Sequence, residues 1–102
     1  MTCEAVVSEA FFLLDRARDG KEALSALLDR GIVRVEFSFA AQQSETLRLI
    51  RRYRDTPMSF ADACLVRMAE QLDGAAVFTT DGDFRTYRRN GRQVIPVIMP
   101  EM

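Results

Sequence analysis

Histidine is absent from this chain of 102 residues. That absence removes the usual general base near neutral pH, the nucleophile pairs in which histidine activates serine or cysteine, and the commonest zinc ligand. Any catalysis must therefore depend on carboxylates, and a hard cation such as Mg²⁺ or Mn²⁺ is their natural partner.

Cysteine is scarce, and long apolar runs are missing. The two cysteines, Cys3 and Cys64, lie far apart and outside any metal-binding spacing. We therefore expect two buried thiols in a reducing cytoplasm rather than a disulfide framework. No apolar run reaches the roughly 18 residues that a membrane span needs. The apolar stretch 10–14 lacks the basic leader and cleavage site of a signal peptide.

Lysine is almost absent too, because Lys21 is the only lysine among the 14 basic residues. Arginine pairs bidentately with phosphate oxygens, whereas lysine offers a point charge. The net charge of −1 gives no general attraction to polyanions, so the distribution of the arginines matters more. They form two clusters, each either a solvated helix face or a nucleic-acid contact: Arg48, Arg51, Arg52 and Arg54, then Arg85, Arg88, Arg89 and Arg92.

Helical and extended patterns alternate along the chain. Thr2 is the expected N-cap of a helix that continues to Leu14 and is apolar on nearly every side, which predicts a buried helix. Asp19 and Glu22 have the spacing of a capping box for a second helix. Alternating apolar residues predict a strand over 32–37.

The second half of the chain continues the alternation. An amphipathic helix is expected over 42–54, and Ser59 is the expected N-cap of the next helix. Strands are expected over 75–79 and 94–99, and Pro96 places the last one at an edge or a bulge. Strands separated by helices imply crossover connections, so we predict one domain over 1–102, an α/β sandwich with a mostly parallel sheet.

Several carboxylates have unusual surroundings. Glu9 lies within the apolar first helix, where it either occupies the one exposed edge or has a partner such as a metal ion. Asp62 has the capping-box spacing from Ser59, a role that is compatible with a functional one. Asp81 directly follows the strand over 75–79, where α/β folds place their chemistry, although Asp81 and Gly82 are also a turn signal. Asp83 is a weaker candidate.

Three short blocks resemble the conserved blocks of PIN domains in order and spacing. They run from Thr2 to Ala10, from Phe60 to Ala63 and from Thr79 to Phe84, and the likeness extends to about Val97. The basic run Arg85 to Arg88 resembles the tail that follows the last block in many bacterial members.

The resemblance implies a ribonuclease of the toxin–antitoxin type. Its metal site, with Mg²⁺ or Mn²⁺, would contain Glu9, Asp62 and Asp81, with Asp83 as a further acid, and the ions would activate water for attack on an RNA phosphodiester. The implied partners are RNA, which phosphate-binding arginines would hold, a cognate antitoxin and a second copy of the chain. The arginines concerned are Arg85, Arg88 and Arg89.

The sequence departs from the family at its beginning. PIN domains usually start with a central strand that carries an invariant Asp, and no counterpart precedes Thr2 here. A misassigned start, a degenerate remnant, and a gap that a partner, a second copy or a changed strand order closes are three explanations. Because one carboxylate would be missing from the metal site, we expect low nuclease activity.

Two other functional interpretations stay open. A PIN-like module could bind RNA or a protein without cutting. A generic doubly wound α/β domain of the receiver or flavodoxin type is the third interpretation, although the chain shows no glycine-rich phosphate loop.

Overall fold

The computed structural model describes residues 1–79 and 82–99. Within this part of the chain, four α-helices come first and short strands follow. The elements are α1 (Glu4–Leu13), α2 (Gly20–Asp29), α3 (Phe39–Arg52), α4 (Phe60–Gln71), β1 (Val77–Phe78), the 3-10 helix η1 (Gly82–Arg85), β2 (Arg88–Arg89), β3 (Gln93–Val94) and β4 (Val97–Ile98).

The strands form two pairs. β1 and β4 are parallel, with Val77 opposite Val97, whereas β2 and β3 form an antiparallel hairpin with Arg88 opposite Val94. A further parallel bridge joins Thr2 to Val35. Helices together with a small parallel sheet confirm the predicted α/β class, and the antiparallel β2–β3 hairpin is an addition that the sequence did not predict.

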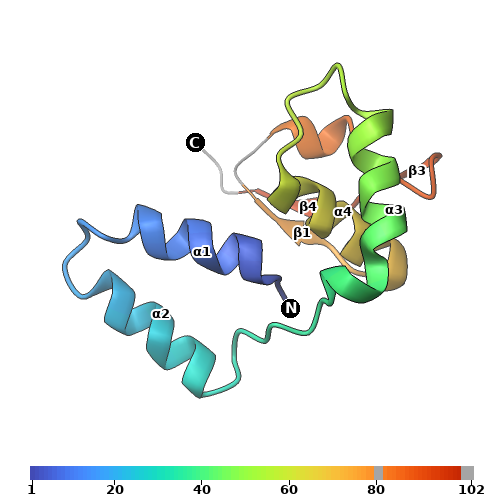
Figure 1. Ribbon diagram of the computed structural model, residues 1–102. Helices are drawn as coiled ribbons and strands as arrows, with labels where there is room; N and C mark the ends of the chain where they lie inside the picture. The colour runs from blue at the N-terminus through green and yellow to red at the C-terminus, as the bar shows by residue number, and fades with distance from the viewer. Residues whose placement is uncertain (80–81, 100–102) are drawn as a thin grey trace.

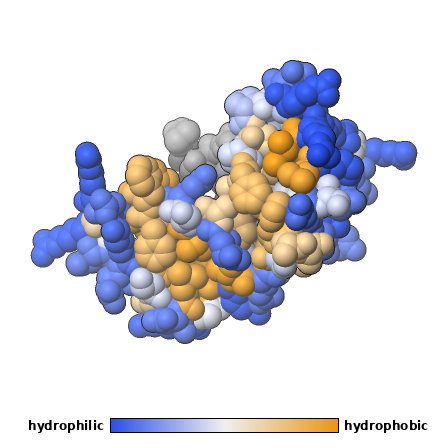
Figure 2. All heavy atoms as spheres, in the orientation of Figure 1, coloured by the Kyte–Doolittle hydropathy of each residue, from blue (hydrophilic) through white to orange (hydrophobic). Residues whose placement is uncertain are grey.

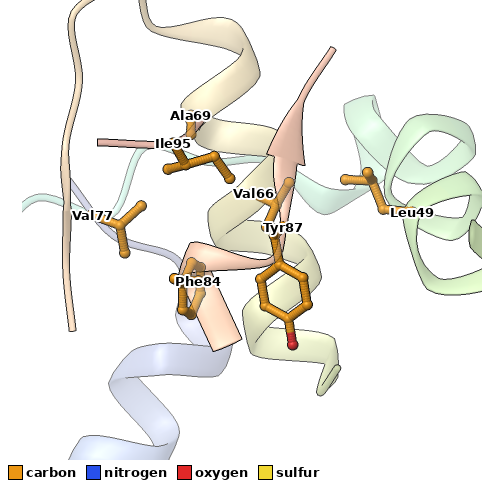
Figure 3. Packing of buried hydrophobic residues seen from close by; sticks show 7 residues of the cluster. All are labelled: Leu49, Val66, Ala69, Val77, Phe84, Tyr87 and Ile95. Atoms are coloured by element: carbon orange, nitrogen blue, oxygen red, sulfur yellow. The ribbon is translucent and has the colours of Figure 1, made fainter. Parts of the chain in front are cut away.

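The main hydrophobic core lies between α3, α4 and the strands. α4 contributes Val66 and Ala69 to it, and the other members come from α3, β1, η1 and the segments around the hairpin (Figure 3). Tyr87 and Phe84 are its largest side chains, and their rings pack edge to face with centroids 5.2 Å apart. We call α3, α4 and the segments from β1 to β4 the core region. α4 is at its centre, because it contacts both α3 and β2, and α1 contacts it from outside the core region.

α1 and α2 form a separate pair of helices, here called the α1–α2 lobe, and an extended segment connects it to α3 (Figure 1). The predicted burial of the first helix is wrong, because no residue of α1 or α2 is buried. α1 contacts α2 and α4, while Phe12 keeps 80% and Leu13 75% of its surface exposed. No helix in the described ranges is long and apolar enough to cross a membrane.

The predicted cap of the first helix is wrong, and the second predicted cap, Asp19, has the predicted position without the capping box. α1 begins after Cys3 rather than Thr2, because the Thr2 N–H donates to the Arg34 carbonyl at 2.8 Å and Thr2 belongs to the bridge. Asp19 precedes α2 but makes no side-chain cap bond, and its φ of 56° places it in the left-handed region rather than the extended conformation typical of an N-cap.

The strand predicted over 32–37 does not form. Its only pairing within the described residues is the bridge at Val35, and Ile32 keeps 66% of its surface exposed. Alternating apolar residues make a strand only where a neighbour pairs with the backbone. Here the Ile32 and Val33 N–H groups donate instead to the Leu27 carbonyl of α2, at 3.1 and 3.2 Å. Phe37 does reach the interior, where it packs against Cys3, Cys64 and Met68.

The second half follows its sequence more closely. α3 begins at Phe39, earlier than expected, because Ser38 accepts a hydrogen bond from the Ala41 N–H at 3.2 Å. The last predicted strand is divided into β3 and β4. Pro96, which lies between them, has no N–H to donate, and its carbonyl accepts from Val77 at 2.8 Å.

Candidate functional site

Asp62 has the best-defined geometry of the candidate acids. Its Oδ2 accepts a hydrogen bond from the Ser59 N–H at 3.1 Å, and its own N–H donates to Ser59 Oγ at 3.0 Å. Both halves of the predicted capping box are therefore present. The box fixes the carboxylate at the first turn of α4, where the helix dipole favours a negative charge. Because one carboxylate oxygen is used by the box, Oδ1 is the atom available to a ligand.

Glu9 lies on the exposed side of α1. Of the two interpretations that the sequence left open, the structure supports the exposed edge. A carboxylate in water needs no counter-ion, so the location of Glu9 by itself does not demand a metal. The helix that carries Glu9, α1, contacts α4, the helix that carries Asp62.

Asp83 lies in η1, directly before the buried ring of Phe84. Its carbonyl accepts hydrogen bonds from the N–H groups of Thr86 at 2.9 Å and Tyr87 at 3.2 Å, so the residue helps to shape the turn that leads into β2. Asp81, the acid predicted to follow the strand, lies outside the described residues.

The described acids do not form a metal site by themselves. Across residues 1–79 and 82–99, no three carboxylate or cysteine side chains are close enough together to hold a metal ion. Glu9, Asp62 and Asp83 therefore do not fit a divalent cation as a set of three. Asp81 is the remaining acid of the predicted metal site.

The three arginines predicted to contact RNA differ in how far they are engaged. Arg85 is exposed, whereas the Arg88 Nη1 donates to the Arg85 carbonyl at 2.6 Å and to the next two carbonyls of the turn. The Arg89 Nη2 donates to Asp73 Oδ1 at 2.9 Å and to the Glu70 carbonyl, and this side chain is only 12% exposed. Arg89 therefore attaches β2 to the end of α4.

Glu70 is a structural carboxylate that the sequence reasoning missed. Its side chain is 1% exposed, accepts from Arg67 Nη1 at 3.2 Å, and accepts from the Asn90 N–H at 2.6 Å. Arg67 Nε in turn donates to the Gln42 side chain at 2.8 Å, so one network joins α3, α4 and the hairpin. Its position seven residues after Ala63 and four after Val66, on the apolar face of α4, was the available signal.

Comparison with known proteins gives one positive result. Comparison with curated proteins and comparison with solved structures each found no match. A family model described as PIN domain matches residues 1–90, which include the blocks around Glu9, Asp62 and Asp81. PIN domains are nuclease-like modules that generally depend on a divalent metal and commonly act on RNA. Because the match covers most of the length of the chain, the chain belongs to the PIN domain family.

Proposed function

We propose that this chain is a cytoplasmic ribonuclease module of the toxin–antitoxin type whose own cleavage activity is low. The observation that carries the proposal is the PIN match over residues 1–90. The proposed acids are Glu9, Asp62 and Asp81, with Asp83 beside them. When bound, Mg²⁺ or Mn²⁺ would supply charge stabilisation and an activated water.

The low activity is inferred from the described acids. Glu9 is exposed on the α1–α2 lobe, Asp62 gives one oxygen to its capping box, and neither joins a described group of three metal ligands. Two-metal chemistry needs shared ligands around ions about 3.5–4 Å apart. A site in which the acids are held less closely would bind the cation weakly and cleave slowly.

The test is cleavage of a fluorescent single-stranded RNA with added Mn²⁺. We expect the unmodified chain to cleave slowly, and Asp62→Asn or Asp81→Asn to remove this slow cleavage. Asp29→Asn is the control, since it makes the same chemical change on an exposed part of α2. Rapid cleavage that disappears in Asp62→Asn or Asp81→Asn, but not in Asp29→Asn, would contradict the proposed impairment.

Metal binding tests the family chemistry separately from the rate. Titration with Mn²⁺, followed by the electron paramagnetic resonance signal of the free ion, should show binding that is weakened by Asp62→Asn and Asp81→Asn. Asp29→Asn should bind as the unmodified chain does. Equal binding by all these variants would refute the assignment of the acids.

A module that binds RNA without cutting it is the second candidate. The observation in its favour is the absence of a three-acid group across the described residues. It predicts RNA binding in EDTA together with no cleavage in Mn²⁺. Detectable Mn²⁺-dependent cleavage that requires Asp62 would exclude it.

A second copy of the chain and an antitoxin are the proposed protein partners. α1 supports this, because its exposed Phe12 and Leu13 leave apolar surface in water. Light scattering should give a dimer for the unmodified chain and a monomer for Phe12→Ser. Phe78→Ser is the control, since that ring is 77% exposed on β1. A monomeric unmodified chain would remove the dimer from the proposal.

A further inference from the structure

The end of α3 and the β2–β3 hairpin lie side by side, although they are distant in sequence (Figure 1). Arg52 Nη2 donates to the Gly91 carbonyl at 3.0 Å, and the Arg88 N–H donates to the Tyr53 hydroxyl at 2.9 Å. The Arg52 guanidinium also lies 5.6 Å from the centroid of the Tyr53 ring. These contacts join the two arginine clusters, which the sequence separates.

Gly91 shows how close this contact is. A Cβ at that position would lie 2.6 Å from Arg52 Nη1, and the φ of Gly91 is +73°, a conformation that side chains rarely adopt. The positive φ is what favours glycine at this position, whereas the end of the Arg52 side chain could shift to make room for a Cβ.

The arginines around this junction form what we call the α3–hairpin arginine surface. Three of them have exposed side chains that form no hydrogen bond or ion pair with the described part of the chain: Arg51, Arg54 and Arg92. Arg52 and Arg88 complete the surface. Asp55 is the exposed acid that follows Arg54, while the neighbouring Glu45 is neutralised by Arg48 at 2.7 Å. The excess charge is therefore positive, in a chain whose net charge is −1.

The chemistry of the surface favours a phosphate backbone over a protein. Protein interfaces have an apolar centre, whereas contacts with nucleic-acid backbones depend on arginine and lysine. The large exposed apolar residues lie mainly on α1, the segment after α2, β1 and β4, and Val94 is the one on the hairpin among the described residues. Figure 2 likewise shows the larger apolar area over the middle of the molecule, and a mainly hydrophilic surface with a smaller apolar patch at the end that holds α3.

We infer that the α3–hairpin arginine surface binds the phosphate backbone of single-stranded RNA. The inference rests on the proposed function, and it assigns the contact to Arg51, Arg54 and Arg92, which the sequence left open between a solvated face and a nucleic-acid contact. Arg89 holds the hairpin on α4 and acts on RNA only by positioning.

The experiment measures the binding of a fluorescent oligouridine 20-mer by anisotropy in EDTA, where cleavage cannot occur. Arg51→Gln with Arg54→Gln should weaken binding about tenfold at moderate salt. It should also reduce the slope of log affinity against log salt by about 1.4, since each lost phosphate contact contributes about 0.7. Arg92→Gln alone should have roughly half the effect on the slope.

The matched control is Arg16→Gln with Arg18→Gln, which removes the same charge from the exposed connection between α1 and α2. Its binding should equal that of the unmodified chain. Equal weakening by both double variants would show a general charge effect and overturn the inference, as would no binding by the unmodified chain. Competition by polyglutamate as strong as competition by RNA would identify a surface for acidic protein and also overturn it.

This result is separable from that of the nuclease proposal. Asp62→Asn should abolish any Mn²⁺-dependent cleavage without changing RNA binding in EDTA. Loss of binding in Arg51→Gln with Arg54→Gln supports the surface whether or not the chain cleaves. Circular dichroism should be unchanged in every arginine variant, because the substituted side chains are exposed.

Discussion

The core region and the α1–α2 lobe contain similar proportions of apolar residues but bury them to different extents. α1 is more apolar along its length than α4, yet α4 contributes six buried residues and α1 none. The difference comes from neighbours. α4 is covered by α3, β2 and α1, whereas the main neighbours of α1 among the described elements are α2 and α4. Burial therefore depends on how many elements surround a helix, and composition alone does not determine it.

The largest expected effect is on the free energy of unfolding, and it is seen when one phenylalanine ring is removed from each region. Phe84→Ala should reduce the free energy of unfolding by about 4 kcal/mol, because the ring is 1% exposed and its removal leaves a cavity. In the monomer, at concentrations too low for a dimer to form, Phe12→Ala removes the same ring from a site that is 80% exposed and should change the free energy by about 0.5 kcal/mol or less. Urea denaturation measures both. Comparable losses would show that α1 is covered in solution.

The same comparison explains which parts of the structure could be predicted. Periodicity and capping identified α4 and its Ser59–Asp62 box, because both depend on residues within one turn of each other. The pattern over 32–37 predicted a strand that does not form. A strand requires a partner, and the described part of the chain offers this segment only Thr2. Local interactions can be recognised in the sequence, whereas long-range pairing cannot.

The candidate site shows the same limit. The family blocks indicated Glu9, Asp62 and Asp81, but the sequence left open whether Glu9 would be exposed. Nor could the sequence show that Arg89 turns toward Asp73, or that Arg52 meets Gly91, which is 39 residues away. These contacts depend on how the hairpin packs against α3 and α4, and that packing is a property of the whole core region.

The next effect concerns the buried carboxylate of the core region. Glu70→Ala should destabilise the fold by about 3 kcal/mol, because the Asn90 N–H and Arg67 lose their acceptor in a buried site. Glu45→Ala breaks an exposed pair with Arg48 and should cost less than about 1 kcal/mol. Thermal unfolding distinguishes them. Similar melting temperatures for the two variants would mean that Glu70 is accessible to water in solution.

Cys64 provides a smaller, pH-dependent effect at the boundary between α4 and the lobe. Burial raises the pKa of its thiol from 9.0 to about 12, and the adjacent Cys3 contributes in the same direction. The folded chain therefore keeps the thiol neutral where the unfolded chain ionises. This contribution to stability is complete below pH 9 and is lost as the pH rises from 9 toward 12, by about 1.4 kcal/mol per pH unit.

The measurement is urea denaturation at several pH values between 9 and 11. Cys64→Ala lacks the thiol at this position, so its stability should fall less steeply with pH than that of the unmodified chain. Comparing slopes cancels the contributions of the groups that the two proteins share. Parallel slopes would show that the Cys64 thiol ionises as easily in the folded chain as in the unfolded one.

The smallest effect compares the N-caps of the two regions. Ser59→Ala removes a side chain that accepts from the Asp62 N–H at 3.0 Å, and the loss of this cap should cost about 1 kcal/mol. Asp19 makes no cap bond, and its φ of 56° is tolerated by asparagine as well as by aspartate. Asp19→Asn should therefore leave the free energy of unfolding nearly unchanged. A loss in Asp19→Asn as large as in Ser59→Ala would mean that Asp19 caps α2 in solution, and the α1–α2 lobe would then be held by the same local interactions as α4.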